Sequence, residues 1–185
     1  MTATAPTTIS NPPTTGHDAL AIANLFLDFG ARDGVPIDPL KLQKLVYLAH
    51  GWHLGLTRQP LIFQTVVAWP YGPIIRDVYW RFKKYGGGNI SGRATIAPDG
   101  VNTFEHVPLR ADLSDKSREI VDRVWEVFKN NSGIELSAMS HAAGTPWHDA
   151  TRGKAKKEIR DLPISNQVIS DYFQSLARER SRATA

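Results

Sequence analysis

The sequence predicts a mainly α-helical protein: a compact single-domain helical bundle around a central helix, with a small β-hairpin insertion. Three observations support this fold class. Apolar residues recur at helical spacing in five segments and in the central stretch 38–56, which is the clearest. Hydrophobic residues make up 42% of the 185 residues, which is enough for a packed core. Helical spacing is absent from residues 89–113, and this interval carries the signals of a hairpin.

The N-terminal part is expected to be a tail followed by the first helix. Residues 1–17 are rich in Thr and Pro and offer little to bury, so we expect a mobile tail. From Asp18 onward the apolar residues follow helical spacing, and Gly30 or Gly34 is expected to end this helix.

The central helix is predicted over residues 38–56. Asp38 is a favourable N-cap, because its carboxylate can accept hydrogen bonds from backbone N–H groups of the first turn, and Pro39 suits the first helical position. The apolar residues that follow cover about one third of the helical wheel, which is wide enough to face a core. This apolar arc consists of Leu42, Leu45, Val46, Ala49, Trp52 and Leu56, and the residues expected at its edges or outside it are Lys41, Gln43, Lys44 and Tyr47.

A short strand, a turn and a helix are predicted next. Residues 61–69 are rich in β-forming residues, so we expect a strand or extended segment. Residues 69–73 should form a rigid turn, because two prolines fix φ and the glycine between them permits positive φ. Pro73 can also begin the following helix, which the three glycines at 86–88 end. Its apolar face consists of Ile75, Val78, Tyr79, Phe82 and Tyr85.

The insertion is predicted to be a hairpin of residues 94–97 and 101–105 around the turn at 98–100. Ser114 then caps another helix, and residues 135–141 form a short one. The inward residues of the first of these helices are expected to be Ile120, Val121, Val124, Val127 and Phe128.

The C-terminal part is predicted to contain a further turn and the last helix. Thr145 is expected to be an N-cap with Pro146 at the first helical position, and Pro163 interrupts the chain again. Residues 178–185 are expected to fray. The apolar face of the last helix is expected to contain Val168, Ile169, Tyr172, Phe173 and Leu176.

Composition excludes several classes of function. The chain has no Cys, which excludes disulfides, thiolate zinc sites and Cys nucleophiles and agrees with a reducing cytoplasm. No apolar run approaches 18 residues and no secretory signal is recognisable, so we expect no membrane association. The net charge is +4, and residues 152–160 hold five basic residues and one acid. This patch is weaker than the stripe of a dedicated nucleic-acid binder, so we expect weak or no nucleic-acid binding.

The histidines do not form a convincing chemical site. His50 and His53 are neighbours on a helix surface, but no Glu of an HExxH motif and no third ligand accompany them, so packed histidines are favoured over a metal pair. His141 follows a Ser, yet the Gly-x-Ser-x-Gly context of a hydrolase is absent. We therefore predict no catalytic residue, no metal and no cofactor.

Aromatic side chains in turns are the most informative candidates for binding. Trp69, Tyr71 and Trp147 each lie in a turn with Pro or Gly, which holds a side chain at low entropic cost, and such aromatics are frequent interface anchors. The alternative for Trp69 and Trp147 is that they simply fill the core between helices.

Three stretches together resemble a known family. Residues 41–52 (KLQKLVYLAHGW) resemble the KLQKLLYLAxGW core of the SocA-like antitoxins, also called the Panacea domain. Residues 68–86, with AWPYGPI, VY and FKKYG, resemble the same family, and so does His141 with the Thr-Pro-Trp at 145–147. The order and spacing match across roughly residues 18–173.

The resemblance implies a mainly helical antitoxin domain, which we expect to span residues 18–177, from a two-gene, type II toxin–antitoxin pair of a phage-associated family. The cognate protein toxin would be neutralised by direct binding, either by covering its active site or by holding it for a cellular AAA+ protease. The alternatives are a nucleic-acid-binding transcriptional regulator, a prophage-associated accessory protein, or an enzyme that uses His50, His53 or His141.

These considerations predict one partner surface. The turns at 69–73 and 145–147 are expected to lie near each other, against the edge of the central helix that carries His50, and to present a preformed aromatic surface. The predicted partner-binding residues are His50, Trp69, Tyr71, Pro73, His141, Pro146 and Trp147.

Overall fold

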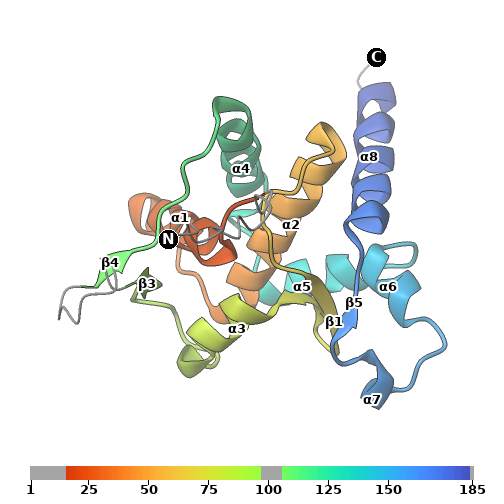
Figure 1. Cartoon of the computed structure of the whole chain (residues 1–185), viewed down its shortest axis with the longest axis horizontal. Coiled ribbons are helices and arrows are strands. Elements are labelled where there is room, and N and C mark those ends of the chain that lie inside the picture. Colours follow the sequence, from red (N-terminus) through yellow and green to blue (C-terminus); the bar gives the residue numbers. More distant parts are fainter. Residues whose placement is uncertain (1–15, 97–105, 184–185) are drawn as a thin grey trace, which may run out of the picture.

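Helices account for most of the structure, a computed structural model that describes residues 16–96 and 106–183 (Figure 1). This confirms the predicted mainly α-helical fold class. The described helices are α1 (Ala19–Asp33), α2 (Pro39–Thr57), α3 (Arg76–Phe82), α4 (Asp115–Phe128), α5 (Gly133–His141), α6 (Pro146–Thr151), α7 (Lys156–Ile159) and α8 (Asn166–Ala183), with a 3-10 turn η1 (Lys83–Tyr85) after α3. The strands are β1 (Val66–Trp69), β2 (Gly72–Ile75), β3 (Thr95–Ile96), β4 (Val107–Pro108) and β5 (Leu162–Pro163).

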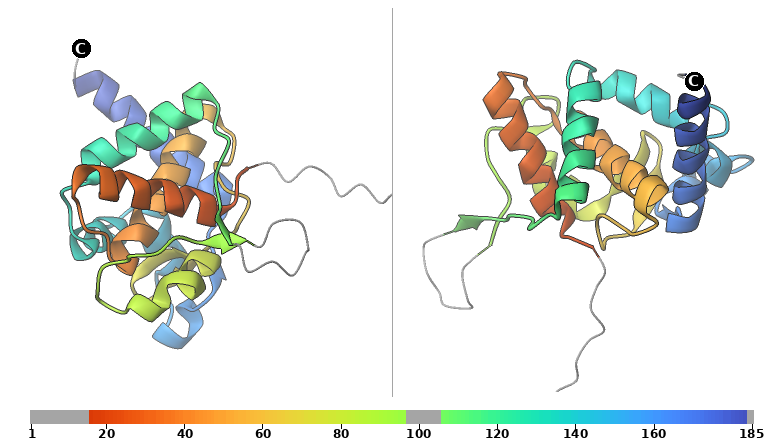
Figure 2. Two further views of the ribbon diagram at one scale, coloured as in Figure 1. Left: turned by 90° about the vertical axis from the view of Figure 1, so that its left-hand side faces the viewer. Right: turned by 90° about the horizontal axis from the view of Figure 1, so that it is seen from above.

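Helix α2 is the centre of the bundle, as predicted. Seen from above, α1 and α4 lie on one side of it and α8 lies on the other (Figure 2). Helix α5 and strand β2 also pack against it. The close approach of α8 depends on glycines in α2, because a Cβ at Gly55 would lie 2.8 Å from the Cβ of Phe173, and one at Gly51 would overlap the Phe173 ring.

The burial of α2 differs from the predicted one-sided pattern. Helices α5 and α8 and strand β2 cover the sides of α2 that the helical wheel predicted to face solvent. The residues expected at the edges or outside the apolar arc are therefore buried: Lys41, Gln43, Lys44 and Tyr47. Conversely, Leu56 is 52% exposed, since it lies in the last turn of α2, where the helix leaves the core. Val127 and Val168 were also expected inside and are exposed instead.

The predicted helix caps are present. The carboxylate of Asp38 accepts from the backbone N–H of Lys41 at 2.9 Å. The hydroxyls of Ser114 and Thr145 cap α4 and α6 in the same way. Gly34 ends α1 with φ of 67°, the left-handed conformation that favours glycine. Helix α8 continues to Ala183, so the expected fraying from residue 178 is not observed in the described residues.

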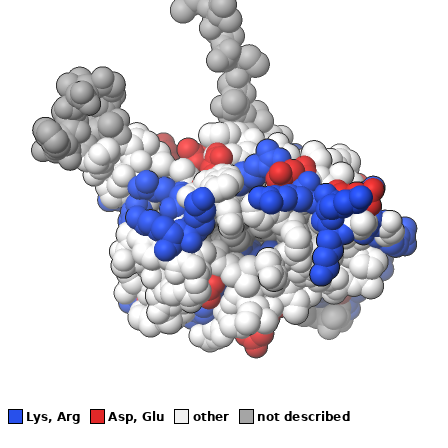
Figure 3. Space-filling view, turned by 90° about the horizontal axis from the view of Figure 1, so that it is seen from below, with Lys and Arg blue, Asp and Glu red and all other residues white. Residues whose placement is uncertain are grey.

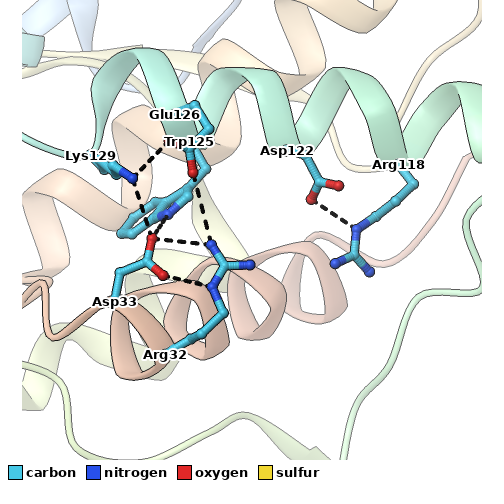
Figure 4. A network of polar contacts seen from close by, with 7 residues as sticks. All are labelled: Arg32, Asp33, Arg118, Asp122, Trp125, Glu126 and Lys129. Atoms are coloured by element: carbon cyan, nitrogen blue, oxygen red, sulfur yellow. Dashed lines mark hydrogen bonds and ion pairs between the residues drawn. The ribbon is translucent and has the colours of Figure 1, made fainter.

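A polar network joins α1 to α4 (Figure 4). The indole N–H of Trp125 donates to Asp33 Oδ2 at 2.7 Å, and Arg32 and Lys129 lie against the same carboxylate. The hydrogen bond from Arg32, followed by that from Trp125, lowers the pKa of Asp33 well below its ordinary value. Within this network, the cations on α1 and α4 are therefore paired with acidic groups of the same two helices.

Strands β1 and β2 form an antiparallel hairpin, and β5 pairs with the other edge of β1. The prediction that Pro73 begins a helix was wrong: Pro73 pairs with Ala68 within β2, and α3 begins at Arg76. Gln43 of α2 fixes this strand, because its side-chain amide donates to the carbonyl of Ile75 and accepts from the Ile75 N–H.

The inserted hairpin lies beside α1. Thr95 pairs with Pro108 and Ile96 with Val107, whereas the predicted turn at 98–100 and second strand at 101–105 lie outside the described residues. The base of the hairpin is held by Asn24, whose amide group makes hydrogen bonds of 2.8 and 2.8 Å with the backbone of Ala94. In the part of the chain that the structure describes, no helix is both long and apolar enough to cross a membrane.

Candidate functional site

The turn between β1 and β2 projects an aromatic side chain from the bundle. Trp69 pairs with Gly72, so Pro70 and Tyr71 form the loop of the hairpin. The side chain of Tyr71 is 72% exposed. Gly72 is required at this position, because its φ is +100° and because a Cβ there would lie 2.5 Å from the ammonium group of Lys44.

Lys44 holds this turn from beneath. Its side chain is completely buried, and its ammonium group donates to the carbonyl oxygens of Tyr71 at 2.6 Å and Pro73 at 3.0 Å. Burial lowers the pKa of Lys44 to about 7. Because a cation in the core favours strong acceptors, the two carbonyls are held where Lys44 places them, and the loop conformation is fixed by α2.

Helix α5 contacts the same turn from a second side. The hydroxyl of Ser137 donates to the carbonyl of Tyr71 at 3.0 Å. The two ring nitrogens of His141 face the carbonyl oxygens of Pro70, at 3.2 Å, and of Ser137. A neutral imidazole can donate only one of these two bonds, whereas the protonated ring can donate both.

Helix α6 brings the second predicted turn against the first. The indole N–H of Trp147 donates to the carbonyl of Trp69 at 2.8 Å, and the Trp147 ring lies edge-on to His141 with centroids 4.0 Å apart. The predicted proximity of the turns at 69–73 and 145–147 is therefore confirmed. Both Trp side chains are partly buried, so they combine packing with a partly exposed surface.

The edge of α2 that meets these turns carries Lys44, not His50, which corrects the predicted placement. His50 lies six residues beyond Lys44 and, at about 100° per residue, points to a different side of the helix. It is completely buried: the backbone N–H of Ile62 lies 3.4 Å from its Nδ1, and its Nε2 lies 3.0 Å from the Asn166 side-chain oxygen. Burial lowers the pKa of His50 to about 4, so it acts as a neutral link between α2 and the start of α8.

Two predicted partner residues support the surface without facing solvent. Pro73 lies in β2, and Pro146 follows the Thr145 cap at the start of α6; both side chains are buried. His53 is also internal, with its ring nitrogens 2.7 Å from the Gln59 carbonyl and 2.9 Å from the Ser117 hydroxyl. Within residues 16–96 and 106–183, no group of three or more His, Asp or Glu side chains could hold a metal ion.

Sequence reasoning missed the residues that lock the other side of the turn. Asp161 accepts from the indole N–H of Trp69 at 2.8 Å and from the Arg76 guanidinium at 2.9 Å. The hydrogen bond from Trp69 is the largest cause that lowers the pKa of Asp161. The Arg160 guanidinium lies 4.8 Å from the centre of the Trp69 ring. No local pattern identifies Asp161 as a partner of the turn, because it lies 92 residues from Trp69.

Together these contacts define an aromatic turn surface: Trp69, Tyr71, His141 and Trp147. Its backbone carbonyls are occupied by internal donors, and its exposed ring is that of Tyr71. The arrangement provides a preformed, rigid protrusion, which is suited to inserting into a complementary pocket of another molecule.

Comparison with known proteins identifies relatives of this chain. A family model described as "Antitoxin SocA-like, Panacea domain" matches residues 42–148. Antitoxin SocA from Caulobacter vibrioides (strain NA1000 / CB15N) is 36% identical over 157 residues, which cover 85% of this chain and 82% of the relative. No solved structure matches. The matched interval includes Lys44, the β1–β2 hairpin, α5 and Trp147, so it contains the elements that build the aromatic turn surface.

Proposed function

Because the chain belongs to the SocA-like antitoxins with a Panacea domain, we propose that it is the antitoxin of a type II toxin–antitoxin pair and binds its cognate protein toxin directly. The domain responsible would span residues 18–177 and act in the cytoplasm. The name of the relative supports the antitoxin role, and the geometry of the turn supports a binding mode.

The observation that carries the binding mode is the exposed Tyr71 on a turn that is fixed from inside. Lys44 and Ser137 both bond the Tyr71 carbonyl, so the loop needs little further ordering when a partner binds. An aromatic ring that is 72% exposed on a rigid loop has the character of an interface hot spot. Trp69, His141 and Trp147 would contribute the partly exposed surroundings of the contact, while the buried Pro73 and Pro146 support it from inside.

The proposal is tested by coexpression with the product of the neighbouring open reading frame. We expect the wild-type chain to restore growth when that product is toxic, and Tyr71→Ala to restore it less well at equal protein level. Leu56→Ala is the matched control, because Leu56 is 52% exposed on the far end of α2. If both variants restore growth as well as the wild type, the toxin contacts another surface; if the wild type fails against its neighbour, the antitoxin role itself is contradicted.

We further propose that binding alone neutralises the toxin by covering its active site. A rigid protruding ring suits a concave site, and such a mechanism needs no further component. A purified activity assay of the toxin, without any protease, tests this point: inhibition by an equimolar amount of the wild-type chain is expected. If inhibition requires an added AAA+ protease and ATP, the chain acts instead by delivering the toxin for degradation.

A further inference from the structure

The charge of this protein is concentrated in two segments. Residues 76–85 and 152–161 together hold nine Lys or Arg and three Asp or Glu, a net charge of +6, whereas the whole chain carries +4. All other residues are therefore net negative. Helices α3 and α7, which these segments contain, lie at the same end of the molecule, and Figure 3 shows Lys and Arg gathered in two groups on that side.

A row of aromatic rings connects the two segments. The Trp69 ring lies 4.7 Å from that of Tyr79, which lies 5.2 Å from that of Trp80. A cation covers each end of the row: Arg160 of the second segment lies over Trp69, and the Lys83 ammonium lies 3.8 Å from the centre of the Trp80 ring. The outer ring, Trp80, is 53% exposed. The row therefore consists of three consecutive rings with one cation at each end.

Several cations of this face have no acidic partner. Among the described residues, Arg152, Lys154, Lys156 and Lys157 are exposed and take part in no ion pair. On the α1–α4 side the pattern is opposite, because Arg32, Lys116, Arg118 and Lys129 each lie against a carboxylate. The unpaired cations leave the α3–α7 face with an unbalanced positive field, which attracts polyanions.

We propose that the α3–α7 face binds single-stranded nucleic acid without sequence preference. Phosphates would pair with the cations of residues 152–160, and bases would stack on Trp80 and its neighbouring rings. An acidic peptide would use the same cations but would leave the exposed ring without a partner. This surface shares Trp69 with the aromatic turn surface, but the proposed toxin contact depends on Tyr71, whereas nucleic-acid binding depends on Trp80 and the cations of residues 152–160.

Binding is tested with a fluorescently labelled oligo-thymidine of about 20 nucleotides by anisotropy over a series of salt concentrations. We expect binding at low salt. The logarithm of the association constant should fall linearly with the logarithm of the salt concentration. The double variant Lys156→Glu/Lys157→Glu should bind at least about tenfold more weakly, with a salt slope shallower by roughly 1.4, since each phosphate contact to a single strand contributes about 0.7. Trp80→Ala should weaken binding by roughly fivefold or more through lost stacking.

The matched control is Arg178→Glu/Arg182→Glu, which changes the net charge equally but lies at the C-terminal end of α8, away from α7 (Figure 1). It should retain most of the affinity. If the two double variants lose affinity equally, the effect comes from net charge alone, and the assignment to this face is overturned. Absence of binding at low salt would overturn the proposal. The face would instead be assigned to acidic proteins if poly-glutamate displaces the oligonucleotide at equal charge concentration and Trp80→Ala has no effect. Unchanged melting temperatures establish that the variants are folded.

Discussion

Replacing Lys44 with Met is expected to abolish a rise in stability between pH 7 and pH 9. The buried ammonium group has a pKa of about 7 in the folded protein, against 10.5 in the unfolded chain. In this interval the unfolded chain therefore binds more protons than the folded one, so the free energy of unfolding increases with pH. Well below pH 7 Lys44 is protonated in both states, so its contribution no longer changes with pH.

The size of the effect follows from the two pKa values. Each unit of difference corresponds to about 1.36 kcal/mol, and half of Lys44 is still protonated at pH 7, so the wild type should gain about 2 kcal/mol between pH 7 and pH 9. In Lys44→Met this gain is absent, although the variant leaves the carbonyls of Tyr71 and Pro73 without their donor. Two other buried groups titrate outside this interval: the pKa of His50 is lowered to about 4 and that of Tyr47 is raised above its ordinary value of 10.0. Burial also lowers the pKa of Lys41, but this residue is present in the wild type and in the variant, so the difference between their pH dependences reports on Lys44.

The assay is urea unfolding at pH 7, 8 and 9 for the wild type, Lys44→Met and Lys116→Met. Lys116 is an exposed residue of α4, so its variant leaves Lys44 in place and should keep the full wild-type rise. Parallel curves for the wild type and Lys44→Met would refute the reasoning, because they would mean that Lys44 has the same pKa in the folded and unfolded states.

Three further substitutions test the packing around α2, each by urea unfolding. Leu45→Ala should cost about 2–5 kcal/mol, because Leu45 is completely buried in the core; a loss below about 1 kcal/mol would contradict that placement. The wild type should lose about 3 kcal/mol of unfolding free energy as the pH falls from 6.5 to 4, because the buried His50 ring has a pKa of about 4 and takes up a proton on unfolding. His50→Gln should remove this loss. An equal loss of stability in the variant over the same pH range would contradict the prediction. Gly51→Ala should cost about 1–3 kcal/mol by overpacking against Phe173, and a neutral result would show that α8 can shift away from α2.

Local chemistry explains why much of the fold could be predicted. Asp38, Ser114 and Thr145 cap helices through contacts within three residues, so the sequence contains both partners of each bond. The rigid turn around Gly72 could be predicted for the same reason: the prolines at 70 and 73 fix φ, and the glycine at 72 permits positive φ. The proximity of this turn to Trp147 came from the family resemblance rather than from local chemistry.

The remainder depended on partners far apart in the sequence. Lys44 in a helical pattern is ordinarily a solvent-exposed residue, and only the carbonyls at positions 71 and 73 make its burial favourable. Pro73 suits a helix start as well as an edge strand, and its pairing with Ala68 decided the outcome. The role of Asp161 was invisible for the same reason, since its partner Trp69 lies 92 residues away.

The most direct test of the account is the affinity of Tyr71→Ala for the product of the neighbouring open reading frame, the proposed toxin, measured by titration calorimetry against the wild type and Leu56→Ala. Tyr71 is 72% exposed, so its truncation should leave the melting temperature unchanged. Loss of an interface hot spot of at least about 2 kcal/mol should weaken binding roughly thirtyfold, while Leu56→Ala binds as the wild type does. Wild-type affinity in Tyr71→Ala, with a loss in Leu56→Ala, would place the toxin on the opposite end of α2 and contradict the proposed surface.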